Sequence, residues 1–474
     1  MTEDQYINLC KCCDSIRVAE ESIFERMAIT WLHVVREHHV FLKQYEGIFL
    51  PKPATTANLL NNWRTALLDY ARTVRAGWQF FRYSRKRWCG DLPSGAPVDF
   101  VFVYHLLNLS QLSGEDVFYF GKFPADLIRQ GKSVVVVLIN HSDMPADDVE
   151  DYLAASSIPR LVISSVLSPR DELRILRRTI DEAGRLKHAA TIETPDVRRT
   201  ILSKASIEAT SPVTWASLRI AKLVGEVISH CQPRRVVTTY EGRSFQRLVY
   251  AAGRELSRGI SCIGYQHAAM RLQHAAKRSI GTKFDPDKSL CAGPVGLGQL
   301  QRSRYLPKVQ LAILGPNRSM NNLTCNGVST CLVLPEGITE ECEVLFQFSL
   351  SCARAHLDLL FIWRLHPILS FDKLVRRKGK LEKLPPNIEI STKLLVEDIS
   401  RGSLVLYRGS TAAITAAANG VLPIYVERPV EPTIDPMFEI SDHHPNVHSI
   451  KAFSAALEWT KWTAEARTYC HGSL

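Results

Sequence analysis

The sequence predicts an α/β protein with two domains built on parallel sheets, preceded by a helical N-terminal region. The chain has 474 residues, which is too long for one compact hydrophobic core. From residue 98 onward, short apolar stretches of strand length alternate with helical stretches, and this alternation is typical of βαβ units. Hydrophobic residues make up 46% of the chain and charged residues 22%, so neither a disordered nor a fibrous protein is expected.

Residues 1–95 are expected to form the helical region, with its main helices between about residues 20 and 87. Apolar side chains recur there every three to four positions in two stripes, formed by Phe24, Met27, Trp31 and Val35, and by Trp63, Leu67, Tyr70, Val74 and Trp78. This spacing indicates the buried face of a helix. Pro51 and Pro53 separate the two predicted helices.

The first α/β domain is predicted over residues 96–285. Its strands are expected at 98–104, 133–140, 160–165, 235–240 and 259–266, and its helices at 118–129, 169–187 and 207–231. Because these strands are short and continuously apolar, we expect them to lie inside a parallel sheet.

The second α/β domain is predicted over residues 286–445. Its strands are expected at 289–292, 309–314, 330–335, 359–365, 388–391, 404–407 and 422–426. The stretch 404–426, LVLYRGSTAAITAAANGVLPIYV, has the order of a strand, a tight polar turn, a small-residue helix and a second strand. Residues 446–474 are expected to form a helical tail that packs back across the first domain.

The net charge of +10 suits nucleic acid, an anionic membrane surface or an acidic substrate. The basic residues gather in short patches without the interleaved aromatic residues of nucleic-acid modules, so no nucleic acid partner is expected. No apolar run reaches the roughly 18 residues of a membrane helix, and no signal segment opens the chain. We therefore expect a cytoplasmic protein, with peripheral contact to an anionic inner membrane left open.

No metal site is expected from the sequence. The twelve cysteines are scattered and indicate reduced thiols, and the cluster of Cys10, Cys12 and Cys13 lacks the second Cys/His pair of a zinc site. Asp285 and Asp287 have the spacing of a metal-binding Asp-x-Asp motif, but Pro286 between them favours a simple turn between the domains.

Polar residues follow several predicted strands, at the edge where open α/β sheets bind ligands. These candidate site residues are Glu241, His267, Arg364, His366, Pro367, Arg408, Gly409, Ser410, Thr411 and Glu427.

Two of these groups are suited to phosphate. Free backbone N–H groups, two hydroxyls and a helix dipole converge at residues 408–411, which favours an anion. At His366 the following Pro367 fixes the turn, and the imidazole can donate to a phosphate oxygen. The two motifs could grip one phosphate from both sides.

Each candidate also has an ordinary structural interpretation. Ser410 or Thr411 could be a helix N-cap, and Glu241 could be an acid at a helix start. His267 could be a hydrogen-bonded strand-end histidine, and the two arginines could be rim charges. Glu427 could bind a ribose or form a surface ion pair.

The motifs resemble those of bacterial glycosyltransferases that use CMP-activated acidic sugars in surface carbohydrate assembly, namely sialyltransferases, polysialyltransferases and Kdo transferases of capsule or lipopolysaccharide. Glu241 in TTYEGRS, His366 and Pro367 in WRLHP, and Ser410 and Thr411 in YRGST carry the resemblance, which spans roughly residues 96–430. It implies the GT-B arrangement, in which two Rossmann-like domains face a cleft.

The resemblance also implies roles for these residues. The His and Ser/Thr motifs would hold the CMP phosphate, and the acidic residue would be a base or, in retaining Kdo transferases, the nucleophile. The chain departs from the family at residues 266–268, where Gln-His-Ala stands in place of Gln-His-Gly, and at Glu241, which stands alone where some relatives have two adjacent carboxylates. The sugar and the stereochemical outcome therefore stay open.

The expected function is a metal-independent glycosyltransferase of capsule or lipopolysaccharide synthesis. It would move an acidic sugar from a CMP donor to a glycan or lipid-linked glycan acceptor, without a cofactor other than the nucleotide-sugar substrate. Glu241 and His267 are the expected catalytic residues, and the others would bind the nucleotide. The alternatives are a UDP-sugar transferase, a nucleotide-sugar epimerase or a polyol-phosphate polymerase of the same fold, or a non-catalytic scaffold at the membrane.

Overall fold

A computed structural model gives the architecture of the chain. It describes residues 1–18, 24–49, 87–93, 97–107, 109–112, 119–141, 149–153, 158–163, 167–194, 196–271, 273–303, 306, 308–315, 329–366, 369, 371, 384–429, 431–459 and 462–474. The predicted helix with the Trp63 to Trp78 stripe, and Pro367 of the predicted site, lie outside the described residues.

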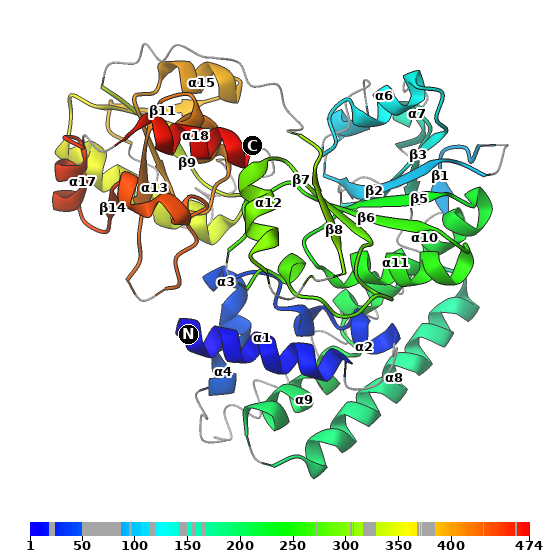
Figure 1. Cartoon of the computed structure of the whole chain (residues 1–474). Coiled ribbons are helices and arrows are strands. Elements are labelled where there is room, and N and C mark those ends of the chain that lie inside the picture. The colour runs from blue at the N-terminus through cyan, green and yellow to red at the C-terminus, as the bar shows by residue number, and fades with distance from the viewer. Residues whose placement is uncertain are drawn as a thin grey trace.

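The first domain is built on an eight-stranded sheet with the order β1-β4-β3-β2-β5-β6-β7-β8 (Figure 1). Its strands are β1 (Trp88–Cys89), β2 (Phe100–Leu106), β3 (Val134–Asn140), β4 (Arg160–Ile163), β5 (Arg235–Thr239), β6 (Ser261–Gln266), β7 (Lys288–Cys291) and β8 (Gln310–Ile313). All neighbours pair in parallel except β1, which runs antiparallel to β4. The carboxyl ends of β2 to β8 therefore share one edge.

Helices cover both faces of this sheet because its strands are apolar on both sides. Val101 and Val103 of β2 pack into one core, and Phe102 and Tyr104 pack into the other. The helices are α6 (Phe123–Arg129), α7 (Glu150–Leu153), α8 (Pro169–Ile192), α9 (Val197–Glu208), α10 (Pro212–Cys231), α11 (Ser244–Leu256) and α12 (Pro294–Gln301).

The starts of α8 and α10 follow from their local sequence. Ser168 and Ser211 each cap the helix by accepting a hydrogen bond from a backbone N–H three residues on, and proline occupies the first helical position.

The second domain is built on a six-stranded parallel sheet with the order β11-β10-β9-β12-β13-β14. The strands are β9 (Thr330–Leu334), β10 (Leu360–Arg364), β11 (Ile388–Ser391), β12 (Leu404–Tyr407), β13 (Leu422–Val426) and β14 (Asn446–Val447). The helices are α13 (Thr339–Ala355), α15 (Leu395–Arg401), α16 (Ala412–Ala418), α17 (Ile450–Ala456) and α18 (Ala464–Ser473), with a 3-10 helix η6 (Phe438–His443). The predicted fold class, two Rossmann-like α/β domains with a helical N-terminal region, is confirmed.

The predicted boundary between the domains at residue 286 is too early. β7 and β8 stand where strands were expected, but β7 pairs with β6 and β8 pairs with β7, so both belong to the first sheet. The physical reason is that a short apolar strand can be buried in either sheet, and its own sequence does not specify its neighbour. The first domain therefore extends through β8.

The N-terminal region contains α1 (Glu3–Val18), α2 (Phe24–Ala28), η1 (Thr30–His33), α3 (His39–Leu42), η2 (Lys43–Tyr45) and α4 (Glu46–Phe49). Its apolar side chains share one core with α8 and α9, which include Leu186 and Leu202, so these helices lie against the first domain (Figure 1). The expectation of one helix through the Phe24 to Val35 stripe is wrong. The chain breaks at Val34, which adopts the left-handed conformation with φ of 41°, and continues as an extended segment to α3.

The end of the chain contacts both domains. In Figure 1, α18 lies beside α12 of the first domain, and it also packs on α16 of the second. A side chain at Gly293 would meet the backbone oxygen of Gly472 at 2.2 Å, so only glycine permits this approach. Among the described residues, no helix has the length and apolar character needed to cross a bilayer.

Candidate functional site

Glu241 follows β5 at the carboxyl edge of the first sheet. Arg243 Nε donates to its Oε2 at 2.7 Å, and its backbone N–H donates to Gln246 Oε1 at 3.0 Å. Burial alone would raise the pKa of Glu241, but the positive charges of Arg243 and Arg36 hold that pKa well below its usual range. Glu241 is therefore ionised at neutral pH.

The loop that carries Glu241 is held in place from three sides. Gly242 has a φ of 74°, and a side chain there would meet the backbone of Ala275 at 2.5 Å, so this position requires glycine. The Gly242 carbonyl oxygen lies 3.0 Å from His33 Nδ1 and accepts from Arg247 Nε at 3.3 Å. The N-terminal region thus helps to fix the predicted catalytic loop.

Histidines surround Glu241 on the neighbouring strand ends. His267 follows β6 and makes an edge-on contact with Tyr119, with ring centres 5.0 Å apart. The His105 ring, at the end of β2, lies 4.7 Å from that of His141, which follows β3. Burial and the nearby His141 lower the pKa of His105 to about 3, and burial together with Arg243 lowers the pKa of His141. His105 and His141 are therefore neutral at pH 7.

The sequence prediction missed His105 and His141, although a signal was present. Both stand where a predicted strand ends, and only the ends of later strands were considered. The charges of Glu241 and His267 act on the pKa of His105, and the His141 ring lies beside that of His105.

On the second domain, Glu336 follows β9 and lies beside Gly409. A side chain at Gly409 would lie 2.0 Å from Glu336 Oε1, so the Glu336 carboxylate lies directly against this turn. Burial lowers the pKa of His366, and the negative charge of Glu336 opposes that shift. Ser410 is buried and Thr411 is exposed, and Thr411 makes no capping hydrogen bond to α16. The Glu336 carboxylate therefore lies against Gly409 and its charge acts on His366, while the joint binding of one phosphate by His366 and the 409–411 turn stays a prediction.

The two arginines predicted to bind the nucleotide form ion pairs with carboxylates of the second domain. Arg364 donates to the buried Asp398 at 2.8 Å. Arg408 is buried and donates to Glu341 at 2.6 Å, to Glu431 at 2.9 Å and to the Val426 carbonyl at 2.8 Å. Both guanidinium groups thus have carboxylate partners within their own domain.

Glu427 is the last of the predicted nucleotide-binding residues. It is half-buried directly after β13, and its backbone N–H donates to the Val447 carbonyl at 2.9 Å.

Residues 35–38, between the turn at Val34 and α3, contact both domains. Val35 accepts from Ala275 N at 2.9 Å, and Glu37 accepts from Gln273 N at 2.7 Å, which fixes the segment to the first domain. The positive charge of Arg36 helps to lower the pKa of Glu241. His38 Nε2 lies 3.2 Å from Glu336 Oε1. Arg36 and His38 are two residues apart, so one short segment brings a positive charge to act on Glu241 and a side-chain contact to Glu336.

The positions considered for metal in the sequence have other partners. Cys10 and Cys13 lie in the core of the N-terminal region, and burial raises the pKa of the Cys10 thiol to about 11. Asp285 forms a buried ion pair with Arg247. Asp287 accepts from Arg254 at 2.8 Å and from Cys262 N at 2.7 Å. These contacts explain both aspartates without a metal ion.

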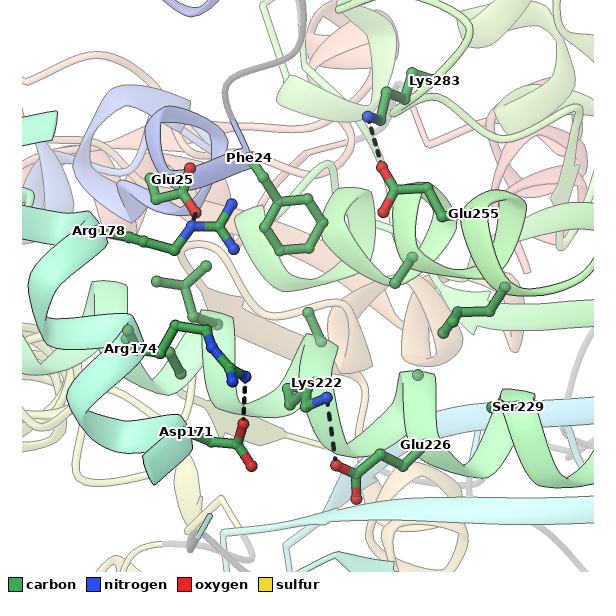
Figure 2. Close-up of a pocket in the computed structure, with 16 residues that line it drawn as sticks. Phe24, Glu25, Asp171, Arg174, Arg178, Lys222, Glu226, Ser229, Glu255 and Lys283 are labelled. Carbon is green, nitrogen blue, oxygen red and sulfur yellow. Dashed lines mark hydrogen bonds and ion pairs between the residues drawn. The ribbon is translucent and has the colours of Figure 1, made fainter. Parts of the chain in front are cut away.

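A cavity of about 440 Å³ opens in the helical layer formed by α2, α8, α10 and α11 (Figure 2). Four ion pairs line it, namely Arg174 with Asp171, Arg178 with Glu25, Lys222 with Glu226 and Lys283 with Glu255. Because each of these cations faces a carboxylate, the charges compensate one another, and the cavity is not a strong anion site.

The carboxylate of Glu341 provides a prediction on acid stability. Burial would raise its pKa, but His39 and Arg408 hold the pKa at about 2, below the ordinary value of 4.5. The stability that the ionised Glu341 carboxylate contributes to the folded state is complete above pH 4.5 and is lost as the pH falls toward 2. Between about pH 5.5 and 3.5, the wild-type chain should lose about 1 kcal/mol more stability than Glu341→Gln. Urea unfolding at both pH values measures this, and equal losses would contradict it.

No protein family and no curated protein matches the chain. Several solved structures align with about four-fifths of its length. A glycotransferase of kitacinnamycin is 13% identical, with a TM-score of 0.47 over 80% of this chain and 94% of that one. UDP-GlcNAc 2-epimerase from Methanocaldococcus jannaschii is 11% identical, with a TM-score of 0.42 over 79% of this chain and 97% of that one. MurG from Acinetobacter baumannii is 11% identical, with a TM-score of 0.44 over 79% of this chain and 94% of that one. At these values the likeness carries no conclusion about activity.

Proposed function

We propose that the chain is a glycosyltransferase that takes a sugar from a nucleotide donor bound at the junction of its two domains. The observation that supports this most is that one short segment contacts both domains, since Glu37 accepts from Gln273 N of the first domain and His38 lies 3.2 Å from Glu336 of the second. Sugar transfer requires a group that accepts the proton of the acceptor hydroxyl and groups that stabilise the departing phosphate.

Glu241 and His267 would serve the acceptor side of the reaction. A carboxylate with a strongly lowered pKa is a weak base, so its ion pair with Arg243 must loosen when substrate binds. The Arg243 side chain is 43% exposed, and an anionic group of the substrate can draw its guanidinium away from Glu241. Arg36 and Arg243 together would suit a sugar that carries a carboxylate.

His366, Ser410 and Thr411 would serve the donor side, together with the backbone N–H groups of the turn. The transfer step itself would need no metal. Glu427, at the end of β13, would accept a hydrogen bond from the donor ribose. The motif resemblance supports a CMP donor and a role in capsule or lipopolysaccharide synthesis, with a glycan or lipid-linked glycan as the acceptor.

One observation favours a second candidate function, a non-catalytic scaffold. The Glu336 carboxylate lies against Gly409, in the space that a donor phosphate would occupy. If this carboxylate keeps its place, a phosphate meets like charge there and does not bind. In the transferase proposal, Glu336 moves aside when the donor enters.

Isothermal titration with CMP, CDP and UDP tests the proposal. The wild-type chain should bind CMP with a dissociation constant below about 1 mM. Because a hydrogen bond to a charged group contributes about 1.5–3 kcal/mol, His366→Ala should weaken binding at least about tenfold. His188→Ala, on the exposed side of α8, is the matched control and should bind as the wild type does. Absence of CMP binding would exclude the CMP donor, and absence of binding for all three nucleotides would favour the scaffold.

A further inference from the structure

A buried cluster of histidines and carboxylates joins the N-terminal segment to the second domain. His39 Nε2 lies 2.8 Å from Glu341 Oε1, and His39 Nδ1 lies 3.2 Å from Glu431 Oε2. The neighbouring His38 Nε2 lies 3.2 Å from Glu336 Oε1. His38 is 4% exposed, His39 is 7% exposed and Glu341 is 1% exposed. These groups connect parts of the chain that are about 300 residues apart in sequence.

We propose that His38, His39 and Glu341 bind a divalent transition-metal ion of the zinc type. One ligand atom from each of the three residues lies within 4.8 Å of the others. Two imidazoles and a carboxylate are a donor set that suits zinc and its neighbours in the first transition row. This site is independent of the proposed sugar transfer, since none of the three residues is among its catalytic or nucleotide-binding groups.

Two buried polar atoms of the cluster lack a well-formed hydrogen bond. Glu341 Oε1 and His39 Nδ1 are buried, and neither takes part in a contact of hydrogen-bond geometry, although a polar atom lies close to each. Buried polar atoms without such a bond are costly. A metal ion between His39 Nε2 and Glu341 Oε1 would satisfy the carboxylate oxygen and leave Nδ1 to donate to Glu431.

The surroundings supply the second set of contacts that metal sites need. Arg408 Nε donates to Glu341 Oε2 at 2.6 Å, which leaves Oε1 directed at the histidine. Glu431, which also accepts from Arg408 at 2.9 Å, faces the far nitrogen of His39. Such carboxylate contacts orient a ligating histidine and increase its basicity. One contact opposes the proposal, because Val40 N donates to His38 Nδ1 at 3.3 Å, and this long bond must break if His38 binds metal through Nε2.

The charges of the side chains around the cluster also favour a bound cation. Glu341 and Glu431 meet one buried guanidinium, that of Arg408, and Glu336 lies against His38, so three carboxylates face one arginine and two histidines, and the arginine balances only one of the three negative charges. The half-exposed Arg428 contacts Glu431 at 2.7 Å and offsets part of the remainder. A buried excess of negative charge needs a compensating cation, and a divalent ion supplies it. With three protein ligands, water would fill the fourth position of a tetrahedral zinc ion, and the ion would hold the N-terminal segment on the second domain.

The test uses the full-length chain, dialysed against chelator and titrated calorimetrically with ZnCl₂. One Zn²⁺ per chain should bind with a dissociation constant below about 1 μM, which corresponds to about 8 kcal/mol, and should raise Tm. His39→Ala should weaken binding at least about a hundredfold, and Glu431→Gln by about 10–100-fold. His188→Ala, the matched control, should bind as the wild type does.

The second variant keeps the test decisive if the first one fails to fold. If His39→Ala does not fold, the weaker binding of Glu431→Gln, which keeps both histidines, decides the question. The proposal is overturned if the wild-type chain binds no stoichiometric zinc, or if the folded variants bind it as tightly as His188→Ala. Since the readout is metal binding and stability, its outcome does not depend on whether the chain transfers sugar.

Discussion

Replacing Glu241 with glutamine is expected to lower the rate of sugar transfer by about 10²–10⁴-fold, the usual contribution of a general acid–base group. The amide keeps the size of the side chain but removes the charge that Arg243 and Arg36 now hold in the ionised form. Nucleotide binding should stay within about twofold of the wild type, because the donor phosphate is assigned to the other domain. Donor consumption and product formation, followed by chromatography and mass spectrometry, measure the first effect, and calorimetry measures the second.

The control for this variant is Glu255→Gln, which removes an exposed carboxylate paired with Lys283 on the helical layer. It should transfer sugar at the wild-type rate. If Glu241→Gln is as active as Glu255→Gln, Glu241 is not a catalytic residue and the assignment to the first domain fails. A parallel loss of nucleotide binding would instead place Glu241 in donor recognition.

Replacing Arg247 with methionine is expected to destabilise the chain by about 3–5 kcal/mol, the usual cost of leaving one partner of a buried ion pair alone. Arg247 is fully buried and pairs with Asp285. It also donates to the carbonyls of Ala275 and Arg278, both at 2.9 Å, and to that of Gly242. Because methionine keeps the apolar length of the side chain, the measured loss reports the missing charge and donors. Urea unfolding of the purified variant measures it.

The matched control is Arg234→Met, which removes an arginine that is 68% exposed and lies 3.6 Å from Asp99. An exposed ion pair contributes at most about 1 kcal/mol, so this variant should be nearly as stable as the wild type. Equal effects of the two substitutions would show that the Arg247 network does not hold the Gly242 loop. A large loss confined to Arg247→Met would explain how Glu241 keeps its place.

Most of the fold could be predicted because its strands are marked locally. Strands such as Val134–Asn140 and Leu404–Tyr407 are short apolar runs with a turn at each end, and their positions follow from that pattern alone. The two-residue strands β1 and β14 are too short to carry such a signal. The pairing of β7 with β6 is not encoded in either strand alone, so the boundary between the domains was misplaced.

The positions of candidate residues after strands could be predicted, whereas contacts between distant parts of the chain could not. Glu241 and His366 follow their strands as expected. No local pattern indicates that His38 meets Glu336 across 298 positions, since such a contact depends on how the N-terminal segment passes between the domains. The partner of Arg408 could not be predicted either. The sequence around an arginine after a strand is the same whether its side chain faces a ligand or a buried carboxylate.

The central claim is that the junction of the two strand edges transfers a sugar from a nucleotide. Product analysis of the wild-type chain, incubated with a panel of CMP-, UDP- and other nucleotide-activated sugars and with glycan acceptors, tests it most directly. One donor, expected to be a CMP-linked acidic sugar, should yield free nucleotide and a new glycoside, and Glu241→Gln should lose this product. If every donor stays intact and none of the nucleotides binds, the claim is contradicted and the chain is a scaffold.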